Sequence, residues 1–206
     1  MADPPVVVTR KAELRARLLA ARAARSAGDR TLAGRLVAAA LAPRLARTPV
    51  VAAYVPTAEE PGAGPLPAAL AAVVGRLLLP VVPDRGRELS WAEYDGRLVA
   101  GRFGLAEPPG PRLPATALGT ADVVVVPALA VARDGSRLGR GAGYYDRALL
   151  LARPGTLLVG VVFDDELLDE VPAGEHDRPV SAVVTPSGGW SPVGRGTLRS
   201  PAAPGH

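Results

Sequence analysis

The chain has 206 residues, enough for one domain with its own core, and its formal net charge of +4 is modest for that length. It contains no cysteine and only two histidines, which excludes disulfides, thiolate metal sites and a histidine cage for zinc. Any bound metal is therefore expected to be a hard cation with oxygen ligands.

The first part of the chain predicts two helices. Thr9 is a candidate cap for a helix over about residues 10–25, and Asp29 is a candidate cap for a second helix that ends near residues 43–47. Apolar side chains recur at helical spacing in both segments.

The beginning of the chain does not read as a signal peptide, because an acid and two prolines stand where basic residues and a longer apolar core are required. No uncharged apolar stretch approaches the ~20 residues of a membrane span. We therefore expect a cytoplasmic protein that does not bind membranes. A monomer is expected.

Short apolar runs rich in β-branched residues predict strands at residues 50–55, 77–82, 123–126, 157–163 and 180–184. Helices are expected at residues 66–76 and 144–152. This alternation predicts an α/β fold, a Rossmann-like three-layer α/β/α domain with a mainly parallel central sheet. Ligands of such sheets bind at the carboxyl ends of the strands.

A small antiparallel hairpin is expected beside this sheet. Asp95 and Gly96 form the dipeptide typical of a type I′ turn, between exposed strand candidates at residues 89–94 and 97–100. With the last strand at residues 180–184, residues 1–186 would form a single domain. Residues 187–206 would form a tail whose proline, glycine and serine content is typical of disordered segments.

The most informative segment is the glycine-rich run at residues 135–147, Gly-Ser-Arg-Leu-Gly-Arg-Gly-Ala-Gly-Tyr-Tyr-Asp-Arg. Glycines let backbone N–H groups approach a phosphate and accept positive φ, and arginines supply forked cationic donors. A carboxylate close behind can hold Mg²⁺. The segment therefore predicts an anion-binding loop.

This loop differs from the two common phosphate motifs. It lacks the Gly-Lys-Ser/Thr ending of a Walker loop, and its glycines at 139, 141 and 143 alternate with single residues, unlike the dinucleotide fingerprint. A plain surface connection is the alternative interpretation. Arg137, Arg140 and the run Tyr144-Tyr145-Asp146 argue against it, although one of the two tyrosines is expected to anchor the core.

Lys11 is the only lysine among the 24 basic residues. It marks either a place where a flexible point charge is needed instead of a planar guanidinium, or chance retention on a solvated helix end. Arg15 lies four residues later and therefore shares its helix face.

The run at residues 137–146 resembles the signature of the 5-formyltetrahydrofolate cyclo-ligase family, also called methenyltetrahydrofolate synthetases. Shorter segments in matching order extend the resemblance over most of the chain: Lys11-Ala-Glu-Leu-Arg15, Tyr54-Val-Pro, Val124-Val-Val-Pro127 and Glu175-His-Asp177.

This resemblance implies an ATP-dependent, Mg²⁺-requiring ring closure that converts 5-formyltetrahydrofolate into 5,10-methenyltetrahydrofolate, with ADP and phosphate as the other products. In the family, the γ-phosphoryl group of ATP moves to the formyl oxygen and N10 then attacks the activated carbon. Such a reaction needs charge neutralisation and positioning more than a covalent nucleophile. The expected partners are these small molecules, and no nucleic acid is expected.

The resemblance also implies roles for individual residues. Arg140, Tyr145 and Asp146 would take part in catalysis, and Asp146 and Asp177 would hold Mg²⁺. The ATP site would comprise Lys11, Arg15, Arg137, Leu138, Gly139, Arg140, Gly141, Ala142, Gly143, Tyr144 and Tyr145. The folate site would comprise Val55, Glu60, Phe103, Arg140 and Tyr144.

Two positions depart from the family pattern. Glu60 is followed by Pro-Gly-Ala, where the family usually has an aliphatic residue, an acid and a threonine, and this leaves Glu59 as the alternative folate ligand. Glu166 stands where many members have glutamine. Simpler interpretations also exist for the acids: Glu60 as a solvated loop residue, Asp146 in the first turn of a helix, and Asp177 in a turn before a proline.

Two functions of other classes are the alternatives. A nucleic-acid-binding protein would agree with the positive charge, but only 4% of residues are aromatic and the arginines interleave with acids. A regulatory relative would keep the ATP loop and lack the folate site because of the change after Glu60.

Overall fold

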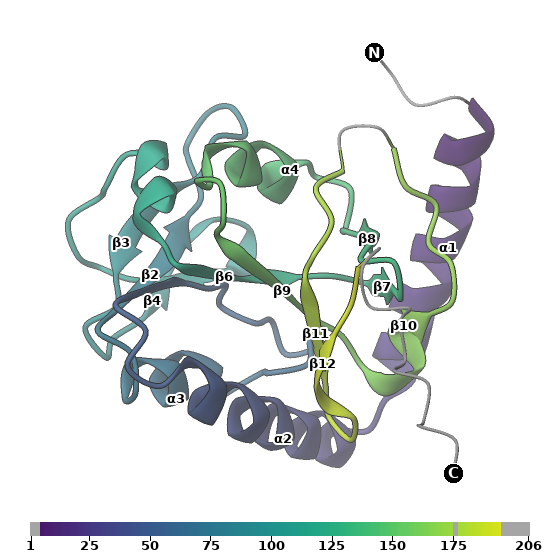
Figure 1. Ribbon diagram of the computed structural model, residues 1–206, viewed down its shortest axis with the longest axis horizontal. Helices are drawn as coiled ribbons and strands as arrows, with labels where there is room; N and C mark the ends of the chain where they lie inside the picture. Colours follow the sequence, from purple (N-terminus) through teal and green to yellow (C-terminus); the bar gives the residue numbers. More distant parts are fainter. Residues whose placement is uncertain (1–4, 175–176, 195–206) are drawn as a thin grey trace, which may run out of the picture.

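The computed structural model describes residues 5–174 and 177–194. Its main strands are β1 (Val50–Ala52), β2 (Arg76–Val81), β3 (Ser90–Glu93), β6 (Val123–Pro127), β9 (Leu157–Val161), β11 (Ala182–Thr185) and β12 (Gly189–Pro192). Within these residues they form a seven-stranded sheet in the order β12-β11-β9-β6-β1-β2-β3 (Figure 1). The inner strands pair in parallel, and the edge strands β12 and β3 pair antiparallel with their neighbours.

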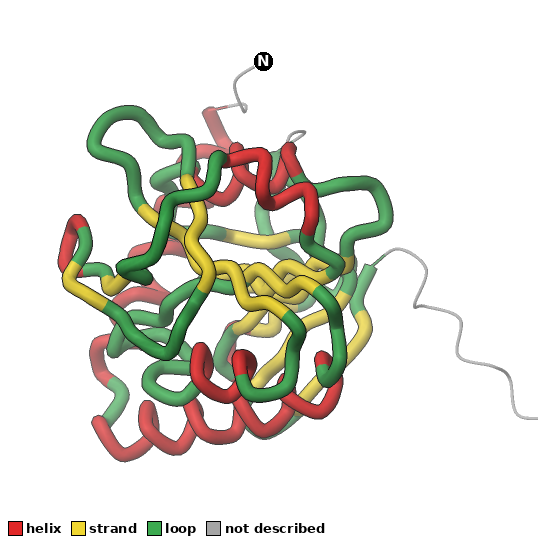
Figure 2. The backbone as a smooth tube through the Cα atoms, turned by 90° about the vertical axis from the view of Figure 1, so that its left-hand side faces the viewer, coloured by secondary structure: helices red, strands yellow, loops and turns green. Residues whose placement is uncertain are grey.

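Helices cover both faces of this sheet, because successive side chains of a strand point to opposite faces. Val123 and Val125 of β6 pack toward α2 (Ala27–Leu45) and α3 (Leu66–Ala71). Val124 and Val126 belong to the core that includes the end of α4 (Tyr144–Ala148). Figure 2 shows the strands between these two helical layers. The expected three-layer α/β/α fold with a mainly parallel sheet is confirmed.

Two smaller sheets accompany the central one. A three-stranded sheet of β7 (Ala130–Ala132), β8 (Arg137–Leu138) and β10 (Leu167–Leu168) lies beside α1 (Pro5–Ala24). A two-stranded antiparallel sheet joins β4 (Val99–Ala100) to β5 (Ala106–Glu107). Short 3₁₀ helices complete the fold: η1 (Arg102–Gly104), η2 (Ala115–Thr120), η3 (Leu149–Leu151) and η4 (Asp164–Glu166).

A buried ion pair ties α1 to the rest of the domain. Arg22 donates through Nε to Glu166 Oε1 at 2.7 Å and through Nη2 to Glu166 Oε2 at 2.8 Å. The same Nη2 donates to the carbonyl of Ala128 at 2.6 Å, just beyond β6. Both side chains of the pair are only 1% exposed. The position of α1 therefore depends on a guanidinium whose bonds are satisfied inside the protein.

The expected position of the antiparallel hairpin is wrong. Asp95 does not have the positive φ that a type I′ turn requires at both central residues, and its carboxylate instead accepts a hydrogen bond from Arg97 N. Trp91 of β3 is fully buried and pairs with Pro80 of β2. The small antiparallel sheet is formed by β4 and β5, so residues 89–94 serve as an edge strand of the central sheet.

Several expected boundaries also change; the helix expected at residues 66–76, for example, ends at Ala71. Residues 6–9 are already helical, since the intrinsic penalty of valine in a helix is small, so Thr9 is not the cap of α1. Ser26 caps α2, and its hydroxyl accepts a hydrogen bond from Asp29 N. The strand at residues 180–184 is not the last, because β12 pairs with β11 inside the segment expected as a tail. The division at residue 186 stays a prediction, and residues 195–206 lie outside the described chain.

No helix in the described ranges combines the length and the hydropathy needed to cross a bilayer.

Replacing Arg22 by methionine should destabilise the domain by about 3–5 kcal/mol, because it leaves the Glu166 carboxylate buried without its partner. Chemical unfolding followed by circular dichroism measures this loss. The matched control is Arg17→Met, which removes an exposed arginine of the same helix and should change stability little. The double variant Arg22→Met/Glu166→Met should recover most of the loss, and equal stability of wild type and Arg22→Met would contradict the role of the pair.

Candidate active site

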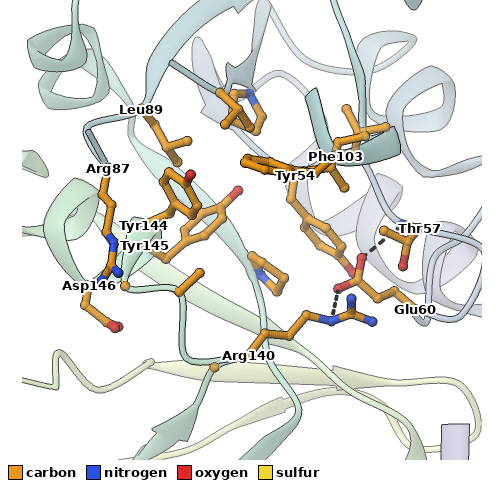
Figure 3. A pocket seen from close by; sticks show the side chains of 18 of the residues that line it. Tyr54, Thr57, Glu60, Arg87, Leu89, Phe103, Arg140, Tyr144, Tyr145 and Asp146 are labelled. Atoms are coloured by element: carbon orange, nitrogen blue, oxygen red, sulfur yellow. Dashed lines mark hydrogen bonds and ion pairs between the residues drawn. The ribbon is translucent and has the colours of Figure 1, made fainter. Parts of the chain in front are cut away.

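A cavity of about 550 Å³ lies at the carboxyl ends of β1, β2 and β6 (Figure 3). Tyr54 and Glu60 follow β1, Leu89 lies in the loop after β2, and Pro127 ends β6. The glycine loop at residues 139–143, between β8 and α4, forms a further wall. Parallel pairing brings the ends of these strands to one edge of the sheet, so segments far apart in sequence share the cavity.

Arg137 anchors the glycine loop. Its side chain is 3% exposed, and its Nη2 lies 2.6 Å from Asp146 Oδ1. Asp146 is 47% exposed and lines the cavity. The pair joins the strand before the loop to the helix after it, so both ends of the loop are held together.

The loop also takes its shape from glycine and from α1. Gly141 and Gly143 have φ values of 97° and 75°, in the left-handed region that favours glycine. Arg15 donates through Nε to the carbonyl of Gly139 at 2.9 Å. A Cβ at Gly141 would lie only 3.3 Å from that same Nε, so a larger residue there would press on the arginine that supports the loop.

Lys11 pairs with Asp177 on the α1 side of the loop. Lys11 Nζ lies 2.8 Å from Asp177 Oδ2, which also accepts a hydrogen bond from Gly174 N. Burial alone would raise the pKa of Asp177, but the bonds from Gly174 and Lys11, with the nearby charge of Arg137, outweigh burial and lower it. Asp177 is therefore held as a carboxylate close to the base of the loop.

The cavity wall contains most of the residues implied by the family resemblance: Val55, Glu60, Phe103, Arg137, Gly139, Arg140, Gly141, Ala142, Gly143, Tyr144, Tyr145 and Asp146. Four others do not line it in the described chain. Lys11 and Arg15 extend from α1 behind the loop, Asp177 pairs with Lys11, and the side chain of Leu138 packs in the core near Leu18. The ligand roles of all these residues stay predictions.

Glu60 is better placed than Glu59 to accept hydrogen bonds from a ligand. Its side chain is 9% exposed, Thr57 N donates to Oε2 at 2.9 Å, and Arg140 Nε lies 3.6 Å from Oε1. Glu59 is 48% exposed and lies 3.7 Å from Arg140 Nη2. The Glu60 carboxylate is already largely shielded from water, so it loses less hydration than the Glu59 carboxylate would when a ligand donor binds. This difference favours Glu60 as the ligand.

Three cavity-lining residues hold buried polar atoms that lack a hydrogen-bond partner among the described residues: Tyr145 Oη, Thr57 Oγ1 and Arg137 Nε. Burial, followed by the charge of Glu60, raises the pKa of Tyr145, so its phenol stays neutral and can donate. Buried polar groups are normally satisfied, and an orphaned hydroxyl in a cavity therefore points to a bound ligand as its partner.

Comparisons with known proteins give the chain its family. The family model of 5-formyltetrahydrofolate cyclo-ligases matches residues 7–186. The chain belongs to the 5-formyltetrahydrofolate cyclo-ligase family. A 5-formyltetrahydrofolate cyclo-ligase of Mycolicibacterium smegmatis is 51% identical over 144 residues, which is 68% of this chain and 74% of the relative. The Escherichia coli K12 cyclo-ligase is 36% identical over 119 residues, 56% of this chain and 65% of the relative.

Solved structures agree with this membership. A 5,10-methenyltetrahydrofolate synthetase of Aquifex aeolicus has 31% sequence identity and a TM-score of 0.72, over 95% of this chain and 96% of that chain. The Mycoplasma pneumoniae synthetase, with 20% identity and a TM-score of 0.66 over 84% of this chain and 96% of its own, supports the fold alone.

In this cyclo-ligase family member, one carboxylate on the cavity wall is suited to bind Mg²⁺. Among the described residues no cluster of three or more acidic or histidine side chains forms a metal site by itself. Asp146 is half-exposed on the cavity wall, and Mg²⁺ commonly binds one or two carboxylates together with phosphate oxygens and water. Asp177 would first have to release Lys11.

Sequence reasoning did not assign several wall residues of this family member to the site, among them Tyr54, Thr57, Arg87 and Leu89. Tyr54 is the last residue but one of the apolar run at residues 50–55, and that position near the carboxyl end of a strand was the available signal. Arg87 lies in an exposed loop without periodicity, so nothing in the sequence distinguishes it. Glu166, the departure from the family pattern, pairs with Arg22 and does not line the cavity.

Tyr145→Phe should leave the stability of the ligand-free protein unchanged or slightly higher, because the hydroxyl that it removes is buried without a partner. The matched control is Tyr54→Phe in the same cavity. It deletes a hydroxyl that donates to the carbonyl of Pro61 at 2.8 Å, and should cost about 1–3 kcal/mol. Urea unfolding measures both, and a comparable loss in the two variants would contradict the assignment of Tyr145 Oη as a group kept for a ligand.

Proposed function

We propose that the protein catalyses the ATP-dependent cyclisation of 5-formyltetrahydrofolate to 5,10-methenyltetrahydrofolate, with release of ADP and phosphate. The observation that carries the proposal is the cavity wall formed by the glycine loop and Asp146 opposite Glu60, in a chain that is 51% identical to a cyclo-ligase over 144 residues. One wall supplies cations and backbone N–H groups for phosphate, and the other supplies a carboxylate for the donor-rich edge of a pterin.

The proposed reaction has two steps. The γ-phosphoryl group of ATP passes to the formyl oxygen and ADP leaves. N10 then attacks the formyl carbon, loses its proton, and phosphate departs with the former formyl oxygen. Both steps need the reacting groups held in line and the negative charge balanced, rather than a nucleophile from the protein.

Arg140 is the cation proposed to balance the charge of the transferring phosphoryl group. It lies on the cavity wall 3.6 Å from Glu60 and 3.7 Å from Glu59, so it is loosely held and free to turn toward a more negative partner. Tyr145, with its neutral hydroxyl, would donate to the formyl oxygen or to phosphate. Lys11 and Arg15 would act on the ATP phosphates from behind the loop.

Mg²⁺ would be held by Asp146 and by phosphate oxygens, and when bound it would neutralise charge on the phosphates. Asp177 is proposed as the second carboxylate ligand of Mg²⁺, after it releases Lys11. We further propose that the protein acts as a monomer in the cytoplasm on these small molecules, without nucleic acid or membrane partners.

The test is a spectrophotometric assay of methenyltetrahydrofolate formation from 5-formyltetrahydrofolate. The absorbance should rise only when both ATP and Mg²⁺ are present. Asp146→Asn should lower turnover by about 100-fold or more, because it removes the negative charge of the carboxylate that would hold Mg²⁺. Asp169→Asn is the control, since Asp169 is a surface acid with a side chain that is 90% exposed.

Two results would contradict the proposal. Product formed without ATP would exclude the phosphorylated intermediate, and full turnover of Asp146→Asn would remove this residue from the site. Calorimetric titration distinguishes a cyclo-ligase from a regulatory relative. A regulatory relative would bind ATP and give no heat of binding with 5-formyltetrahydrofolate.

A further inference from the structure

Two arginines converge at one end of the cavity. Arg87 follows β2 and lines the wall, and Arg147 lies in α4. A Cβ at Gly143 would lie 3.2 Å from Arg147 Nη1 and 3.9 Å from Arg87 Nη1. Both guanidinium groups therefore reach the same point beside the glycine loop.

Arg147 does not itself line the cavity, and it and Arg87 differ from the two other arginines of the wall. Arg137 faces Asp146, and Arg140 faces Glu60. Within the described chain, no carboxylate lies within 4.0 Å of Arg87 or Arg147, and Arg147 makes one long bond, at 3.4 Å, to the carbonyl of Gly143. Two like charges at one point repel each other, and an anion placed between them would remove that repulsion.

The position of this arginine pair within the cavity indicates which anion it suits. In Figure 3, Glu60 and Thr57 lie on one side of the cavity and Arg87 lies on the opposite side, with Tyr144 and Leu89 near Arg87. The cavity thus offers a hydrogen-bond acceptor, then aromatic and apolar side chains, then cations. A folate presents complementary groups in the same order: a donor-rich pterin edge, an aromatic ring and a glutamate with two carboxylates.

We propose that Arg87 and Arg147 form a second anion site, distinct from the Arg137 end of the glycine loop, which binds the carboxylates of the glutamate chain of the substrate. This inference rests on the proposed function and deepens it. Guanidinium groups match carboxylates as forked donors, and the contact would fix the tail end of the folate while Glu60 fixes the pterin end.

The test compares two folates by isothermal titration with wild type and Arg87→Gln. One ligand is 5-formyltetrahydrofolate, and the other is a 5-formyltetrahydropteroyl amide that lacks the glutamate. Arg87→Gln should weaken binding of the glutamate-bearing ligand about tenfold and leave the affinities for the amide and for ATP unchanged. The matched control is Arg85→Gln, an exposed arginine of the same loop that does not line the cavity and should change none of the three affinities.

Other results overturn the inference. If Arg87→Gln weakened the binding of both folates equally, or changed neither affinity, Arg87 would not recognise the tail. A loss of affinity for ATP alone would assign the site to phosphate instead. A wild-type protein that bound neither folate would overturn the proposed function itself. Increasing salt should also narrow the difference between the two folates, because the contact is exposed to solvent.

Discussion

Parallel pairing of β1, β2 and β6 is the constraint on which the site depends. Parallel strands end at the same edge of a sheet, so the segments that follow them meet there even though they are far apart in the chain. Tyr54 and Glu60, Arg87 and Leu89, and Pro127 reach the cavity in this way. The inner strands are buried on both faces, which leaves this edge as the place where the loops can take polar and charged residues.

Ion pairs then fix the wall opposite Glu60. Arg137 and Asp146 hold the two ends of the glycine loop together, and Arg15 of α1 supports the loop at Gly139. α1 is itself held by the buried pair of Arg22 and Glu166. The helix α1 has few core residues of its own, so this ion pair sets its position. Lys11 of α1 thereby lies next to Asp177 beside the loop.

The central sheet and the glycine loop were predictable from the sequence, because they depend on local signals. β-branched runs indicate buried strands, and alternating glycines indicate a loop with positive φ, which Gly141 and Gly143 adopt. The partner of β3 was not predictable, since the choice between β2 and β4 is decided by the burial of Trp91 against distant residues. The convergence of Arg87 and Arg147 on Gly143 depends in the same way on tertiary structure alone.

We propose that the cavity brings the γ-phosphoryl group of ATP to the formyl oxygen of the folate. Turnover of 5-formyltetrahydrofolate labelled with ¹⁸O in the formyl group, followed by mass spectrometry of the released phosphate, tests this transfer. One ¹⁸O atom is expected in each phosphate formed during turnover. Unlabelled phosphate, released together with the cyclised product, would contradict it.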